Sequence, residues 1–107
     1  MMLTLEQLTG RRRQKETADL ARLLAITPEA AGDHSPANLV SLLGLTAKAL
    51  LVEQKRREQA TWFYDVNRHL NLADTADKLM QALALRAGEL SLEQVNTVSS
   101  LINSVKI

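Results

Sequence analysis

A continuous helical pattern from Pro36 to about Leu70 most constrains how this chain can fold. Ser35 followed by Pro36 is a strong helix start, because the serine hydroxyl can cap the first turn and proline suits its first position. No further proline follows before residue 70, and Gly44 is the only glycine of that stretch. A helix of about 35 residues would be roughly 50 Å long. We therefore expect one long helix over 36–70, which protrudes or bends near Gly44 or near residues 53–61.

Hydropathy changes abruptly within this segment. Residues 39–52, LVSLLGLTAKALLV, are apolar on most sides of a helix, which predicts burial. The stretch that follows, EQKRREQAT over residues 53–61, contains Ala60 as its only apolar residue. Because it has no apolar stripe to bury, we expect it to be exposed or to rest against a polar partner.

Trp62, Phe63 and Tyr64 come next and are the only aromatic residues of the chain. On the expected helix, Trp62 and Phe63 share a face with Val66 and Leu70, so they are predicted to anchor the core. Tyr64 lies about 200° around the helix from Trp62, which predicts a surface position. Tyrosine at such a position is typical of protein interfaces and of surfaces that stack on nucleic-acid bases.

The segment before the long helix is expected to hold shorter elements. A capping-box pattern begins at Thr4, but Gly10 weakens the helical pattern soon afterwards. We therefore expect residues 1–10 to form a loosely held N-terminal arm and a firmer helix to cover 11–25. A threonine cap and a first-turn proline then predict a single helical turn over 28–31.

Two further helices are expected after the long one. Residues 71–74 predict a break, and a third helix is expected over 74–87 with Gly88 as its C-terminal cap. A second capping box, Ser91 to Gln94, starts the fourth helix. The predicted inward side chains are Ala76, Leu79, Met80 and Leu83 in the third helix and Val95, Val98, Ile102 and Val105 in the fourth. The outer face of the fourth helix is polar but almost uncharged, which favours packing on another chain.

Composition supports this division into helices. Leu and Ala dominate the apolar residues, both are strong helix formers, and aromatic residues make up only 3% of the chain. A chain of 107 residues is the size of one domain. We therefore predict an all-α fold over 1–107: a small bundle of four main helices, arranged as two helical hairpins.

The basic residues suggest a binding surface even though the net charge is only +1. One basic window holds Arg11, Arg12, Arg13 and Lys15, and the second holds Lys55, Arg56 and Arg57. If the first two helices form a hairpin about residues 26–35, the two windows lie on neighbouring helices, staggered by roughly 12 Å. These residues with Tyr64 would then contact a phosphate backbone or a protein partner. The alternative is a solvated helix face, in which Glu53 pairs with Arg57 one turn later.

Enzymatic chemistry is not expected. The chain has two histidines and no cysteine, which falls short of a metal-binding pattern, and it has no phosphate-binding glycine loop. Asp65 and His69 could begin a metal site, but His69 near a helix end is better explained as a favourable C-terminal charge. The turn at Gly88 resembles a helix-turn-helix connection, yet the following helix lacks the basic start of a recognition helix, so an ordinary helical hairpin is predicted. We expect no cofactor.

No segment predicts export or membrane insertion. The first residues lack the order of a signal peptide, and no apolar run reaches the ~20 residues of a membrane span. We therefore expect a cytoplasmic protein that does not bind membranes. The segment LADTADKLMQALALRAGELSLEQVNTVSSLI, residues 72–102, resembles the helical tails of small phage and mobile-element proteins. This resemblance covers about a third of the chain, rests on the spacing around Gly88-Glu89-Leu90-Ser91, and assigns no role to any residue.

Two functions follow from these patterns. The first is a non-enzymatic small helical subunit or adaptor of a larger assembly, which acts by helix-face contacts with a protein partner or with itself as a homo-oligomer. The alternative is a nucleic-acid-binding protein, either a regulator or a small helical subunit of a nucleoprotein complex, related to phage or mobile-element proteins. It would contact the phosphate backbone through the two basic windows.

Overall fold

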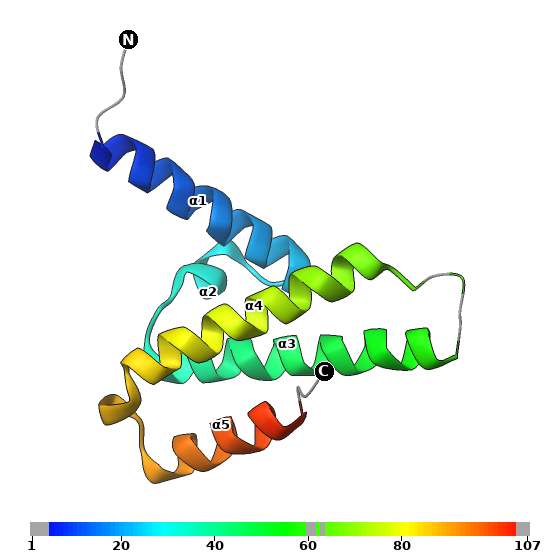
Figure 1. The fold of residues 1–107 in the computed structure, drawn as a ribbon. Helices are drawn as coiled ribbons and strands as arrows, with labels where there is room; N and C mark the ends of the chain where they lie inside the picture. Colours follow the sequence, from blue (N-terminus) through cyan, green and yellow to red (C-terminus); the bar gives the residue numbers. More distant parts are fainter. Residues whose placement is uncertain (1–4, 60–61, 63, 105–107) are drawn as a thin grey trace. The chain divides into compact units, whose positions relative to one another are not determined.

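The computed structural model describes residues 5–59, 62 and 64–104, with side chains from residue 15 onward, and these residues form helices and their connections without a strand (Figure 1). The prediction of an all-α fold with four main helices is therefore confirmed. The long helices are α1 (Leu5–Leu24), α3 (Pro36–Glu58), α4 (Val66–Leu85) and α5 (Leu92–Ser104). The short ones are α2 (Pro28–Gly32) and a 3-10 turn, η1 (Ala87–Glu89).

The chain divides into two compact units, residues 1–33 and 34–107. In the first unit, α2 packs on α1, and Ala21 and Ala31 are buried. The predicted turn at 28–31 is confirmed: the Thr27 hydroxyl accepts a hydrogen bond from the Ala30 N–H at 3.2 Å. Gly10 lies inside α1, so the helix begins before the residue 11 that was expected as the start of its firmer part.

The end of α1 depends on Ala25, whose φ of 55° is the only positive value at a non-glycine residue in the described part of the chain. The Ile26 N–H donates a hydrogen bond to the Ala21 carbonyl at 3.0 Å, and the Ala25 N–H donates one to the Arg22 carbonyl at 3.4 Å. These two bonds form a Schellman motif, which normally has glycine at the left-handed position. The helix therefore ends where the sequence predicted, by a geometry that alanine adopts at a cost.

The second unit is built on an antiparallel hairpin of α3 and α4 (Figure 1). Arg68 at the start of α4 pairs with Glu53 near the end of α3, and Arg86 after α4 donates to the His34 carbonyl before α3. The apolar core of this unit consists of Leu39, Leu42, Leu43, Ala47 and Leu50 from α3 and Leu72, Ala76, Leu79 and Leu83 from α4. The predicted inward positions 76, 79 and 83 are thus confirmed.

The prediction of a single long helix over 36–70 is wrong. The helix α3 ends at Glu58, and α4 begins at Val66, where the Asp65 carboxylate accepts a hydrogen bond from the Arg68 N–H at 3.1 Å. A straight helix would leave the apolar stripe of α3 uncovered, whereas folding back buries it against α4. The predicted break at 71–74 is also absent, because α4 runs through it.

Because the chain forms two helices instead of one, the residues predicted to anchor the core lie at the surface. Trp62 is 92% exposed, Val66 55% and Leu70 61%, although all three were expected to face inward. Phe63 lies outside the described residues. The inward stripe of α4 instead begins with His69, which is 5% exposed and lies in the first turns of the helix instead of near its end. The role predicted for His69, a charge at a helix C-terminus, is therefore wrong.

The helix α5 packs chiefly on α3. Its predicted capping box is confirmed: the Gln94 N–H donates to the Ser91 hydroxyl at 3.1 Å, and the Ser91 N–H donates to the Gln94 side chain at 2.9 Å. The predicted cap at Gly88 is wrong, because α4 ends at Leu85 with Arg86 as its C-cap, and Gly88 lies within η1. Reversal of the chain by a 3-10 turn needs no left-handed residue, so glycine has no special part there.

By length and hydropathy alone, α3 is the one helix of the described chain that could cross a membrane. A buried core helix has the same properties, and α3 supplies much of the core of its unit, including the side chains of Leu43 and Leu50. Packing against α4 accounts for the apolar side chains that α3 buries, whereas Leu45, Leu51 and Val52 of the same helix are exposed.

Candidate functional site

The two predicted basic windows lie in different units of the structure. Residues 11–13 belong to α1, but their side chains lie outside the described part of the chain, and Lys15 is exposed on the same helix. Residues 55–57 form the last turn of α3 in the other unit. Contact of both windows with one phosphate path therefore stays a prediction.

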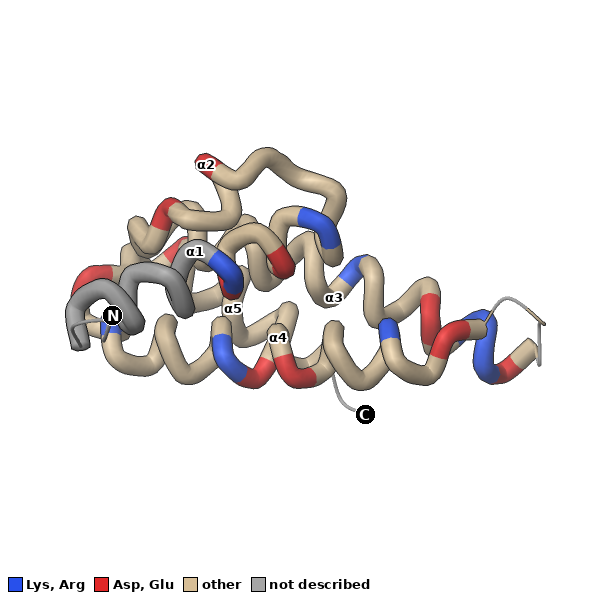
Figure 2. Tube along the Cα trace, turned by 90° about the horizontal axis from the view of Figure 1, so that it is seen from above, with Lys and Arg blue, Asp and Glu red and all other residues tan. Residues whose placement is uncertain are grey.

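The second basic window does not act as a single patch. Lys55 and Arg57 are exposed, whereas Arg56 turns back to Glu53, with its Nη1 atom 2.8 Å from the carboxylate Oε1. Acidic and basic positions are also interspersed along the described helices (Figure 2). The positive charge that the window offers to a partner is thus limited to Lys55 and Arg57, with the acidic Glu58 next in sequence.

Glu53 is the centre of a buried charge cluster that links α3 to α4. Its side chain is 1% exposed, and its Oε1 atom lies 2.8 Å from Arg56 and 3.5 Å from Arg68 Nε. Both arginine side chains are more than one-third exposed, so their charges remain partly hydrated. Oε2 of Glu53 has no hydrogen-bond partner among the described residues. The Glu53–Arg57 pair expected from sequence is replaced by these two pairs, one of which requires the hairpin.

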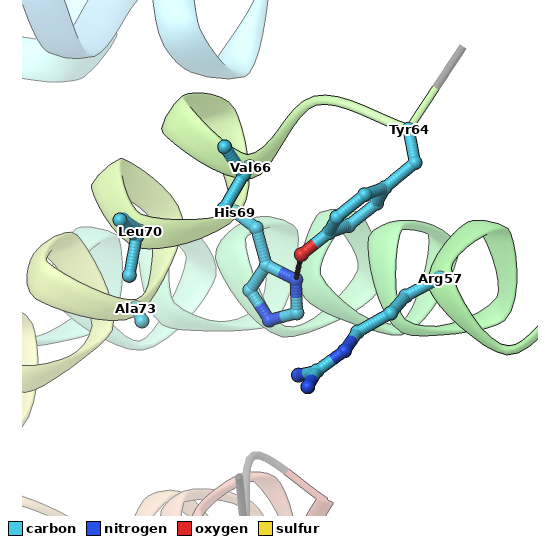
Figure 3. A pocket seen from close by; sticks show the side chains of 6 residues that line it. All are labelled: Arg57, Tyr64, Val66, His69, Leu70 and Ala73. Carbon is cyan, nitrogen blue, oxygen red and sulfur yellow. Dashed lines mark hydrogen bonds between the residues drawn. The ribbon is translucent and has the colours of Figure 1, made fainter. Parts of the chain in front are cut away.

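A pocket of about 310 Å³ opens beside the end of α3 and the start of α4 (Figure 3). Its lining is formed by Arg57, Tyr64, Val66, His69, Leu70 and Ala73. The Tyr64 hydroxyl and His69 Nδ1 are 2.9 Å apart, and the two rings meet edge to face with centroids separated by 5.8 Å. Tyr64 is therefore half-buried and engaged with His69, so only part of its ring is available to a partner.

The metal site considered for Asp65 and His69 has no support in the described residues, where no group of three metal-binding side chains occurs. His69 is turned into the protein and uses Nδ1 for Tyr64. In the described part of the chain, the chemistry of the pocket is thus one cation, one tyrosine–histidine hydrogen bond and an aliphatic wall.

The exposed apolar side chains of the second unit include two groups, one on α4 and one on α5. The first, here called the α4 face, consists of Val66, Leu70 and Ala73, which form the aliphatic wall of the pocket. The second, here called the α5 face, consists of Leu92, Val95 and Ile102, which are 79%, 40% and 41% exposed. Val95 and Ile102 were expected to be buried, as was Val105, which lies outside the described residues. Instead α5 has no buried side chain among its described residues.

Comparison of the chain with models of known protein families, with curated proteins and with solved structures gives no match. Function is therefore inferred from the surfaces of the molecule itself.

Proposed function

We propose that this chain is a non-enzymatic small helical subunit or adaptor, which acts in the cytoplasm and joins a larger assembly through apolar helix faces. Self-association is included in this function. The observation that carries the proposal is the state of α5: an amphipathic helix with no buried side chain among its described residues, and with Val95 and Ile102 each about 40% exposed. Large apolar side chains that are exposed along one face of a helix are typical of interaction sites.

The charge of α5 supports the same function. Glu93 is the only charged residue between Leu92 and Ser104, and the exposed residues beside the α5 face are uncharged polar ones. The centres of protein interfaces are depleted in charged residues, because burying a charge without a partner is costly. A partner helix that presents aliphatic side chains could therefore cover the α5 face without desolvating any charge of α5 beyond Glu93.

The test is a double substitution, Val95→Glu with Ile102→Glu, compared with Asn96→Glu and Asn103→Glu. Both pairs have the same spacing and add the same charge, but only the first pair lies on the α5 face. All four positions are exposed, so both variants should keep the helical circular dichroism of the wild type. The measurement combines quantitative affinity purification with light scattering of the purified chains.

We expect the wild type and the asparagine variant to retain the same partner or the same oligomer, and the Val95/Ile102 variant to lose it. If all three chains recover identical proteins and are monomeric at every concentration, the proposed function is rejected.

A second candidate function is binding of a nucleic-acid backbone, as a regulator or a small subunit of a nucleoprotein complex, related to phage or mobile-element proteins. The observation that favours it is Trp62, which is 92% exposed in the connection that follows the exposed Lys55 and Arg57. Exposed aromatic rings beside cations are typical of single-strand binding surfaces.

This candidate is tested by retention on immobilised single-stranded DNA or RNA as salt is raised. Changing Lys55 and Arg57 to Glu should abolish retention, and changing Arg12 and Arg13 to Glu tests the other window in the same way. Retention that is absent, or that does not depend on salt, would remove nucleic acid as the partner.

A further inference from the structure

The α4 face has the geometry of a second apolar stripe on α4. Val66, Leu70 and Ala73 follow the spacing i, i+4, i+7, so they lie on one side of the helix. The buried stripe of α4, which includes Leu72 and Ala76, lies on a neighbouring side and is already covered by α3. Val66 and Leu70 are more than half exposed, so the core of the unit does not account for them.

Opposite charges stand at the two ends of the α4 face. Arg57 lines the pocket beside Val66 and has no ion pair within the described part of the chain. Asp77 continues the same stripe at i+11, is exposed, and accepts a hydrogen bond from Gln81 at 3.0 Å. No described cation lies within ion-pairing distance of Asp77. The neighbouring Asp74, by contrast, pairs with Lys78 at 3.2 Å.

Resting on the self-association included in the proposed function, we propose that the α4 face binds the α4 face of a second copy of this chain. The two α4 helices run antiparallel about a two-fold axis between Leu70 and Ala73. In this register Leu70 meets Ala73 of the second copy. Arg57, beside Val66, meets Asp77 of the second copy, and the symmetry repeats each contact. An apolar centre is thus closed at both ends by an ion pair.

The charge pattern favours a second copy over other occupants. A face with a cation at one end and an anion at the other is complementary to itself when it is turned through a two-fold rotation. Asp77 would be repelled by the phosphates of a nucleic acid and by an anionic membrane surface. The face is small, and interfaces of less than ~1,200 Å² are weak and transient, so the dimer should form in the micromolar to millimolar range.

The experiment measures the dimer dissociation constant of the full chain by sedimentation equilibrium, at concentrations from about 1 µM to about 1 mM. The variants are R57D, D77R and the double variant R57D/D77R. Arg57 and Asp77 are exposed, so each variant should fold like the wild type, as judged by circular dichroism. Lys48→Asp is the matched control, because Lys48 is an exposed cation of α3 that does not line the pocket.

We expect R57D and D77R each to weaken dimerisation at least tenfold, because each places two like-charged pairs in the interface. The K48D control should dimerise like the wild type. R57D/D77R should recover the wild-type constant within about threefold.

An equimolar mixture of R57D with D77R should dimerise as well as the wild type, because the mixed dimer contains two complementary pairs. Rescue by the double variant but not by the mixture would show that Arg57 and Asp77 interact within one chain, and it would overturn the proposal. A wild-type dimer that is indifferent to both single reversals would overturn it too, but would leave the proposed function standing. A wild-type chain that is monomeric to about 1 mM would overturn the α4 dimer, and the α5 variants then decide the proposed function by themselves.

Discussion

Glu53 is the residue whose surroundings differ most from its sequence context. It opens a strongly polar stretch, yet its side chain is buried to 1% exposure between the two helices. Burial removes water from the Glu53 carboxylate, which costs free energy. The ion pairs with Arg56 and Arg68 compensate only in part, because both arginines remain partly hydrated. Its value to the fold therefore lies in fixing where α4 turns back along α3.

The variant E53Q tests this role. Glutamine keeps the shape of the side chain but removes the charge that both arginines face, so we expect a loss of about 1–2 kcal/mol in the free energy of unfolding. E53M should lose less than E53Q, because methionine has a similar volume but no polar amide that must be desolvated. The control is E58Q at an exposed position, with an expected change within about 0.5 kcal/mol. Equal urea midpoints for E53Q and E58Q would contradict the role of Glu53.

At the scale of elements, the end of α1 differs from the other described helix ends, because its local hydrogen bonds close at a residue with a positive φ. Ala25 stands there at a φ of 55°, where a side chain is unfavourable and glycine is preferred. A substitution at this position can raise stability without changing any side-chain contact, because the free energy gained comes from relief of the backbone conformation.

A25G should therefore stabilise the end of α1 by about 0.5–1 kcal/mol. Ala84→Gly is the matched control, since Ala84 is exposed in the last turn of α4, where the backbone is right-handed, and glycine there should destabilise by a similar amount. Hydrogen exchange of α1 and α4 amides measures both effects. Faster exchange at the end of α1 in A25G would show that Ala25 does not carry this strain.

At Gly44 the opposite substitution, glycine to alanine, is expected to stabilise the protein. It lies inside α3, and a Cβ atom there would meet Leu101 Cδ1 of α5 at 3.9 Å, which is an ordinary contact. G44A should therefore raise the free energy of unfolding by about 0.5–1 kcal/mol, because alanine is the better helix former and no atom has to move. Denaturant unfolding followed by circular dichroism measures the change. A loss of stability would mean that α5 packs on α3 more closely than 3.9 Å allows.

At the scale of the whole molecule, the chain is two compact units of very different size. All buried apolar side chains of the described residues except Ala21 and Ala31 belong to residues 34–107. The hairpin of α3 and α4 thus holds its own core, and burial of that core is the main source of stability for a small unit.

Residues 34–107 alone should fold and unfold in a single cooperative transition, with the helical circular dichroism of three helices. The same fragment with Leu43→Asp is the control, because Leu43 is fully buried and a charge there should abolish folding. A wild-type fragment without a cooperative urea transition would show that residues 1–33 are required for the core.

Sequence reasoning succeeded where a structure is decided within a few residues. The predicted caps at Thr27, Ser35 and Ser91 are all confirmed: each hydroxyl accepts a hydrogen bond from the backbone N–H three residues later. Such caps can be predicted because they involve only neighbours along the chain. Of the candidate site residues, Lys55 and Arg57 are exposed as a binding role requires, while Arg56 is drawn to Glu53. The partner Arg68 carries no local signal, because it comes from the next helix.

The sequence by itself thus determined the all-α class and most of the helix starts, since helix propensity and capping act through neighbours along the chain. Only the tertiary structure decided that the long pattern over 36–70 is two helices. A local pattern there suits a continuous helix and a hairpin equally well, and burial of residues such as Leu72 and Leu79 against α3 favours the hairpin. That same choice buried Glu53 and His69 and left Val66 and Leu70 exposed, which created the α4 face.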